Sequence, residues 1–279
     1  MAVTAVWGWT FVVVKNALTH YPTLPFLELR FVLALVVMAL LVRRLPSRAE
    51  LRIGLIAGSA LAVGYLLQTI GLTMTSPGNA GLITGLFVVF TPLIERVFGV
   101  KVHLRTWIAV ALSLIGTVML TGGPGHIGLG DVLVLIAAVM FAVHIVLLSR
   151  WSPGMAAAPL AMVQMGAGAA LFTASGSFSL RVPAGDVLFA IVITGVFASA
   201  VAFYIQTWAQ AHLDASRTAL ILTTEPAWAL FFAVLLAGQR FGPIEAAGAA
   251  LVLLAIIGHE LAVLRFMSQH EPAKTRRIG

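Results

Sequence analysis

The sequence predicts an all-α integral membrane protein with ten transmembrane helices, arranged as two inverted-topology five-helix repeats with both termini in the cytoplasm. Three observations support this fold class: a very apolar composition, a series of long apolar runs and an internal repetition. Of the 279 residues, 60% are hydrophobic and only 10% are charged, whereas a soluble domain has about 25% charged residues. Because so few charges cannot cover a surface in water, we expect a lipid bilayer to surround the chain.

The apolar runs are about 17–23 residues long and do not alternate strictly with polar residues, which is typical of helices that cross a bilayer core of about 30 Å. The linkers between them are mostly short, and many contain Pro or Gly, as turns do. The ten predicted spans are residues 2–18, 26–43, 53–72, 77–95, 104–121, 130–149, 156–174, 187–208, 215–237 and 243–264.

A weaker copy of residues 195–236 lies 138 residues earlier in the chain, where Gln68-Thr69 aligns with Gln206-Thr207. Such internal similarity is typical of a duplicated membrane-spanning unit. We therefore expect a first repeat at residues 1–122, a second at residues 129–264 and a basic cytoplasmic tail at residues 265–279.

The basic residues predict the orientation, because Lys and Arg gather in cytoplasmic loops. With a cytoplasmic N-terminus, thirteen of them fall in inside loops and the tail, and only Arg181 and Arg240 fall in outside loops. Five spans per half make the second half cross the membrane in the opposite sense to the first, as inverted repeats in transporters do. Because the net charge of +7 comes mainly from these loops and the tail, no nucleic-acid partner is expected.

Glu225 is the most costly residue to place in a membrane, because it is predicted at the centre of the span 215–237. An acidic group there costs at least ~2.5 kcal/mol on insertion scales, and the adjacent Pro226 interrupts the helix. We expect the carboxyl to bind a substrate amine or to titrate during transport. The alternative is a protonated Glu225 that is bound to a neighbouring helix and has a purely structural role.

Five further residues complete the predicted substrate-binding site. Gln68 and Gln206 are symmetry mates that could form polar elements near the two mouths of a pathway, with interhelical hydrogen bonding, worth ~0.6 kcal/mol, as the alternative. Tyr204 and Trp7 could supply an aromatic cavity wall, with anchoring at the membrane interface as the alternative. Asn79 is a polar side chain in a Gly-rich stretch whose helix could be locally open.

Lys15, Arg30 and His144 are polar residues within or near predicted spans. We expect Lys15 and Arg30 to extend toward the interface and hold their helices in register. Pairing with Glu28 or attraction of an anionic group is the alternative for both. A histidine in mid-span can shuttle protons, but we expect His144 to be neutral and to form one hydrogen bond to another helix.

The motifs of enzymes are absent or out of context. His259-Glu260 lacks the second His of a zinc-binding helix, and no G-x-S-x-G or P-loop motif occurs. The G-x-G-x-x-G match at residues 123–128 follows no predicted strand and lies between two spans, so we interpret it as an outer linker. The chain has no cysteine, which excludes disulfides and thiolate metal sites, and we expect no cofactor and no metal.

Four stretches resemble the EamA-type branch of the drug/metabolite transporter superfamily. They are Trp7-Gly8 followed by FVVVK, LELRF around Arg30, residues 76–93 and residues 223–238. Their order and spacing extend the resemblance over nearly the whole chain. The resemblance implies two inverted five-helix repeats, a cavity lined mainly by spans 1, 3, 4, 6, 8 and 9, and export or exchange of small metabolites. Gln239 departs from the pattern, because relatives usually carry Glu there.

Together, the residues and the resemblance predict a secondary transporter of the inner membrane that exports amino acids or related small metabolites by alternating access. The expected partners are a small-molecule substrate and the lipid bilayer, whereas the sequence leaves the oligomeric state open. One alternative is a non-transporting membrane scaffold or receptor subunit, and another is an intramembrane enzyme. A polar cavity inside the bundle would favour the transporter, and a fully packed apolar interior would favour the scaffold.

Overall fold

The computed structural model describes residues 2–99, 101–175, 183, 185–212 and 222–270, and its regular backbone in these ranges is helical, without a strand. The all-α prediction is therefore confirmed for the described residues. The helices are α1 (Ala2–Ala17), α2 (Thr23–Leu41), α3 (Arg48–Met74), α4 (Pro77–Thr84), α5 (Phe87–Val97), α6 (Leu104–Leu120), η1 (Pro124–His126), α7 (Leu129–Trp151), α8 (Ala157–Ala174), α9 (Gly185–Val192), η2 (Ile193–Val201), α10 (Ala202–His212), α12 (Glu225–Ala237) and α13 (Pro243–His270).

Six of the described helical segments are long and apolar enough to cross a membrane. Three others are apolar but shorter, namely α6, α12 and residues Pro243–His259 of α13, and α1 has 16 residues. The number of ten spans and their inverted arrangement therefore remain predictions. The six segments are Thr23–Leu41, Arg48–Met74, Pro77–Val97, Leu129–Trp151, Ala157–Ala174 and Gly185–His212.

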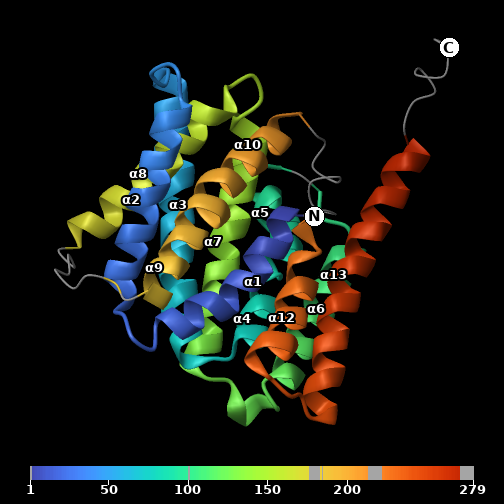
Figure 1. The fold of residues 1–279 in the computed structure, drawn as a ribbon. Coiled ribbons are helices and arrows are strands. Elements are labelled where there is room, and N and C mark those ends of the chain that lie inside the picture. Colours follow the sequence, from blue (N-terminus) through green and yellow to red (C-terminus); the bar gives the residue numbers. More distant parts are fainter. Residues whose placement is uncertain (1, 100, 176–182, 184, 213–221, 271–279) are drawn as a thin grey trace.

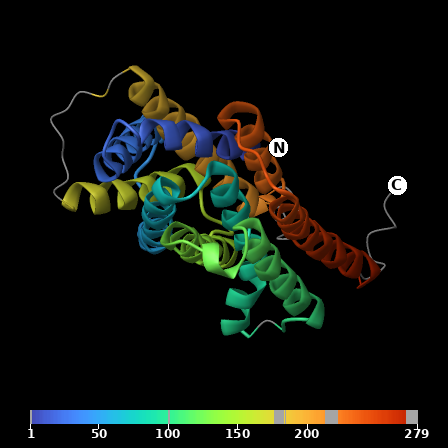
Figure 2. The same cartoon turned by 90° about the horizontal axis from the view of Figure 1, so that it is seen from below.

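Helices of the first half of the chain pack against helices of the second half more than they pack against helices of their own half. Helix α3 lies along α7 and α8, α2 lies against α8, and α1 and α4 lie against α12. Figures 1 and 2 show α13 at the edge of the bundle, where it packs chiefly on α6. The buried core of the protein therefore consists mainly of contacts between the first and the second half.

Small residues let several of these helix pairs approach closely, as is usual for helices in lipid. A Cβ added to Gly54 or Gly58 would meet α8 at 2.6–2.7 Å. A Cβ on Gly116 or Gly248 would meet backbone atoms of the other helix in the α6–α13 pair at 3.0 Å or less. Glycine is thus required at these crossings because any side chain would push the helices apart.

The predicted span 77–95 is two helices with a break between them. Helix α4 ends at Thr84 and α5 begins at Phe87, with Gly85 and Leu86 in a turn. The break lies against α12, since a Cβ on Gly85 would lie 2.1 Å from Cγ of Pro226. The chain therefore bends where it passes the start of α12.

The predicted span 187–208 is one helical segment whose central part is wider than an α-helix. Residues Ile193–Val201 form a π-helix between α9 and α10. In a π-helix the hydrogen bonds join residues five apart, and such turns are frequent at functional sites. The Nε1 atom of Trp7 donates a 2.8 Å hydrogen bond to the carbonyl of Ala198 in this stretch, so the π-helix holds the α1 indole in place.

Two features near the C-terminus differ from the helix pattern that the sequence predicts. Glu225, predicted at the centre of a span, is the first residue of α12, because Thr223 and Thr224 form a turn and Pro226 occupies a position near the helix start where its missing N–H costs nothing. The remainder of that predicted span, residues 215–221, lies outside the described residues. Helix α13 continues to His270, so the first part of the predicted tail is helical, and residues 271–279 lie outside the described ranges.

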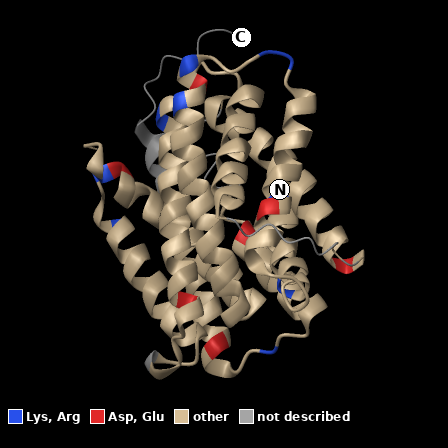
Figure 3. Ribbon diagram, turned by 90° about the vertical axis from the view of Figure 1, so that its left-hand side faces the viewer, with Lys and Arg blue, Asp and Glu red and all other residues tan. Residues whose placement is uncertain are grey.

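The connection between α2 and α3 is held by a charged cluster. Arg44 donates two hydrogen bonds to the carboxylate of Glu50, at 2.6 and 2.9 Å, and this carboxylate also accepts from the backbone N–H groups of Ser47 and Ala156. Glu50 and Ser47 form a capping box at the start of α3. Figure 3 shows that Lys and Arg gather at this end of the bundle and are sparse along its sides.

Candidate functional site

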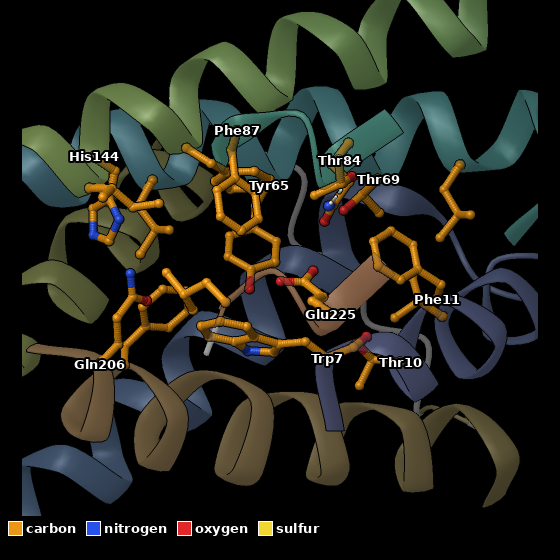
Figure 4. A pocket seen from close by; sticks show the side chains of 18 of the residues that line it. Trp7, Thr10, Phe11, Tyr65, Thr69, Thr84, Phe87, His144, Gln206 and Glu225 are labelled. Atoms are coloured by element: carbon orange, nitrogen blue, oxygen red, sulfur yellow. Dashed lines mark hydrogen bonds between the residues drawn. The ribbon is translucent and has the colours of Figure 1, made fainter. Parts of the chain in front are cut away.

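A cavity lies inside the bundle, between α1, α3, α7, α10 and the α4–α5 break, with the start of α12 as a further wall (Figure 4). Its volume is about 60 Å³, which is room for about four to six water molecules. These helices are the ones that the family resemblance implies for a central cavity, with α2 added through Arg30. A fully packed apolar interior, which would have favoured a scaffold without a binding site, is therefore not observed.

The cavity has an aromatic wall and a polar set, which is the usual composition of a small-molecule site. The aromatic residues are Trp7, Phe11, Tyr65, Phe87, Phe141 and Phe203. The polar residues are Thr10, Arg30, Gln68, Thr69, Thr84, His144, Gln206 and Glu225. Within the described ranges, no group of three His, Asp or Glu residues is arranged to hold a metal ion.

Four of the six predicted site residues line this cavity, namely Trp7, Gln68, Gln206 and Glu225. Tyr204 does not, because its side chain is 38% exposed on the outer face of α10. Residues two positions apart in an α-helix point in directions about 200° apart around the helix axis, so the side chains of Tyr204 and Gln206 cannot face the same side. Asn79 is also absent from the cavity and lies at the end of the bundle where α3 ends and α4 begins.

Glu225 lies at the cavity without a partner of its own. Its side chain is 5% exposed, and among the described residues its carboxyl forms no hydrogen bond and no ion pair. Figure 4 shows the hydroxyl of Tyr65 and the carboxyl of Glu225 pointing toward one another across the cavity. A bond to a neighbouring helix, the structural alternative for Glu225, is therefore not found within the described part of the chain.

Arg30 is, with Tyr65, one of the cavity residues that were not among the predicted site residues. It is 3% exposed, so the expectation that it extends to the interface is wrong. Its Nε donates a 2.9 Å hydrogen bond to Oγ of Ser199, and its Cζ lies 4.2 Å from the centre of the Tyr65 ring. No carboxylate in the described ranges pairs with it.

The position at which α2 begins explains why Arg30 lies inside the bundle. Helix α2 begins at Thr23 rather than at the predicted residue 26, so Arg30 lies seven residues, or roughly 10 Å, along the helix axis. The signal that could have found it was the length of the apolar run after Pro22, since a charge well inside such a run marks a functional position in membrane proteins.

The two glutamines form hydrogen bonds of different kinds. Gln68 donates from Nε2 to Oγ1 of Thr84, at 3.0 Å, and so joins α3 to α4. Gln206 donates to Oε1 of Gln210 on its own helix, at 3.2 Å. Gln210 in turn donates to Oγ of Ser149 on α7. Both glutamines therefore line the cavity, but only Gln68 forms the interhelical hydrogen bond that was their alternative role. Gln206 bonds within α10 and is connected to α7 only through Gln210.

His144 forms the interhelical hydrogen bond that was predicted for it. Its Nε2 lies 2.8 Å from Oε1 of Gln164 on α8, and Nε2 of the same glutamine donates to Oγ1 of Thr207 on α10. Gln164 is fully buried, so it joins three helices behind one wall of the cavity. This arrangement gives His144 a structural role.

A broader surface depression lies at the end of the bundle where α3 meets α4, with Asn79, Gln239 and Lys15 on its walls. Gln239 accepts from the N–H of Gly78 at 2.9 Å and donates to Oγ of Ser76 at 2.8 Å. The family pattern has Glu at this position, and here the amide joins the start of α4 to the end of α12.

Lys15 closes the same end of the bundle. Its Nζ donates to the carbonyls of Leu72, Thr73 and Thr75 at 2.7–3.0 Å, which are among the unpaired carbonyls at the end of α3. The amine does not extend away from the helices to the interface but caps its neighbour.

Comparison with known proteins identifies the fold and the family. The EamA-like transporter family matches residues 1–122 and 128–259. The chain belongs to the EamA-like transporter family. It is a multi-pass membrane protein, and its family has the transporter role that the cavity suggests.

Two relatives of this EamA-like transporter carry names that agree. The protein is 32% identical over 262 residues to an "Uncharacterized transporter" from Archaeoglobus fulgidus, covering 91% of this chain and 82% of the relative. It is 25% identical over 267 residues to the "Uncharacterized inner membrane transporter YedA" of Escherichia coli K12, covering 92% and 87%. A solved crystal structure aligns with a TM-score of 0.68 at 20% identity, over 96% of both chains, which supports the fold alone.

Proposed function

We propose that this EamA-like transporter is a secondary transporter of the inner membrane that exports amino acids or related small metabolites by alternating access. The observation that carries the proposal is the buried cavity, in which Glu225 and Arg30 are both nearly inaccessible and both lack a charged partner among the described residues. Ionisable residues placed within a membrane protein usually mark a substrate or ion pathway. The name of the Escherichia coli relative supports the inner membrane as the location.

The proposed architecture is two inverted five-helix repeats, at residues 1–122 and 129–264, with both termini and the tail at residues 265–279 in the cytoplasm. The two segments matched by the family support this division. The gathering of Lys and Arg at the end with the α2–α3 connection supports a cytoplasmic position for that end (Figure 3). The depression beside Asn79 then faces the outside.

The proposed substrate-binding residues are Glu225, Gln206, Gln68 and Trp7, with Asn79 in the outer approach. Tyr204 faces away from the cavity and is proposed as part of the lipid-facing surface of α10. The cavity of about 60 Å³ is much smaller than the usual range of about 300–1,000 Å³ for ligand pockets. We therefore interpret this conformation as nearly closed, between the two states that alternating access requires.

The test is transport into inside-out vesicles that contain the protein, because uptake there corresponds to export from a cell. Labelled amino acids and small metabolites are offered with and without a proton ionophore. Uptake that the ionophore abolishes supports a transporter driven by the proton-motive force, and uptake that stops at equal concentrations supports a facilitator. Folded protein that takes up none of the compounds contradicts the proposal, and a Glu225→Gln variant that transports normally removes Glu225 from the site.

A further inference from the structure

An acidic and a basic side chain share the small cavity without forming an ion pair with each other. Arg30 is 3% exposed and Glu225 is 5% exposed, and no ion pair joins them. We propose that the cavity binds a compact amino acid as its zwitterion, with the carboxylate on Arg30 and the ammonium group on Glu225. This inference rests on the proposed transport function and adds a carboxylate subsite at Arg30, for which attraction of an anionic group was only the alternative role.

The surroundings of Arg30 prepare it to bind a carboxylate. Ser199 accepts the hydrogen bond from Nε, and the Tyr65 ring packs 4.2 Å from Cζ. These two contacts fix the plane of the guanidinium group. A fixed guanidinium plane presents N–H groups side by side, which match the two oxygens of a carboxylate.

Tyr65 also explains why Arg30 and Glu225 stay apart. Its ring supports the guanidinium group, and its hydroxyl is directed toward the carboxyl of Glu225 (Figure 4). Phe31 and Phe203 hold the ring itself by edge contacts, with ring centres 5.5 and 6.0 Å away. Arg30 and Glu225 therefore both lie beside the side chain of Tyr65.

Charge balance inside the cavity favours a zwitterion over other small metabolites. Removing one partner from a buried charge pair is strongly unfavourable, because the other charge is left without compensation. A zwitterion compensates Arg30 and Glu225 together. A simple amine leaves Arg30 uncompensated, a simple carboxylate leaves Glu225 uncompensated, and a neutral sugar leaves both.

The walls set the size of the ligand. The cavity volume of about 60 Å³ corresponds to only a few water molecules. Its aromatic wall is held rigidly, since the Trp7 indole is bonded to Ala198 and packs 5.4 Å from the Phe203 ring. A small apolar side chain fits this wall, and a large one requires the aromatic residues to move.

The experiment measures binding to the purified full-length protein in lipid nanodiscs by calorimetry. Three probes of nearly equal size separate the charges: L-alanine carries both, L-alaninamide lacks the carboxylate and L-lactate lacks the amine. The wild-type protein should bind L-alanine at least tenfold more tightly than either analogue. Arg30→Gln should lose the preference over L-alaninamide, and Glu225→Gln should lose the preference over L-lactate.

Two further variants keep the result interpretable. Arg30→Lys keeps the charge and removes the planar pair of donors, so binding of L-alanine should weaken at least tenfold in a protein that is shown to remain folded. Lys101→Gln changes an exposed residue before α6 and should bind like the wild type. Wild-type protein that does not bind L-alanine, or an Arg30→Gln variant that keeps the full preference, overturns the inference.

The vesicle assay separates this inference from the function on which it rests. Transport of a neutral or purely cationic metabolite that Arg30→Gln leaves unchanged would refute the carboxylate subsite and keep the transporter. Absence of transport for every compound, from protein shown to be folded, would refute the transporter and the zwitterion site together.

Discussion

Replacing Gly81 with Ala should separate α4 from α12 and disturb the cavity. A Cβ at this position would lie 2.1 Å from Cβ of Ala229, whereas ordinary contact begins at 3.4 Å. The two helices must therefore move apart by at least 1.3 Å, the difference between these distances. Overpacking of this kind costs about 1–3 kcal/mol. Because α12 begins at Glu225, the same movement displaces the cavity carboxyl.

The assay for Gly81→Ala is thermal unfolding in nanodiscs, together with the uptake measurement in vesicles. The expected loss of stability corresponds to a fall in Tm of roughly 2–12 °C. The matched control is Gly166→Ala, because a Cβ there meets only Leu35 Cδ1 at 3.6 Å. This change should leave stability unchanged or raise it slightly, since alanine favours the helix over glycine.

A compensating change tests whether the contact itself causes the loss. In the double variant Gly81→Ala with Ala229→Gly the methyl group moves from α12 to α4 and the contact between the helices is relieved. The double variant should recover most of the stability that Gly81→Ala loses, which a double-mutant cycle reports as a coupling energy. If Gly81→Ala unfolds at the same temperature as Gly166→Ala, or if the double variant recovers nothing, the close α4–α12 contact is refuted.

Three further predictions concern hydrogen bonds that join the helices, and each is measured as the Tm in nanodiscs. Gln239→Leu removes the hydrogen bonds to Gly78 and Ser76, and each loss should lower the stability by about 0.5–1.5 kcal/mol. Gln239→Glu restores the family residue and still accepts from Gly78, so its Tm should stay near that of the wild type. Gln164→Leu leaves buried partners on α7 and α10 unsatisfied and should cost about 1–3 kcal/mol of stability. A loss below about 1 kcal/mol would contradict its central role. Lys15→Met leaves three carbonyls at the end of α3 without their donor and should lower the stability by about 1 kcal/mol. Lys15→Arg keeps N–H donors there. Equal Tm values for these two variants would refute the capping of α3 by Lys15.

The helices and much of the cavity could be predicted from the sequence because both depend on local patterns. Long apolar runs give helices, and an acid within such a run is expensive wherever it lies, so Glu225 was found without a structure. Gln68, Gln206 and Trp7 were found because the internal repeat and the family resemblance point to the helices that carry them. These signals are properties of single segments, and single segments are what a sequence shows most directly.

The remaining features depend on how helices contact one another. The Gly-rich stretch that ends at Gly85 indicated a locally open helix, but it did not indicate that Pro226 of a distant helix approaches the break. Arg30 was misplaced because its helix starts earlier than the apolar pattern indicated. The orientation of Tyr204 could have been corrected from the sequence, since helical geometry places it opposite Gln206.

The packing of the two halves on each other has a consequence for biosynthesis. Since α3 lies along α7 and α8 and α6 pairs with α13, the first helices to leave the ribosome lack their main partners until the second half is inserted. Small domains usually fold as units during synthesis, N-terminal part first. Here the early helices have to wait in the bilayer as separate hydrophobic segments. Assembly is then a late event that requires the helices of the second half, including α13 as the partner of α6.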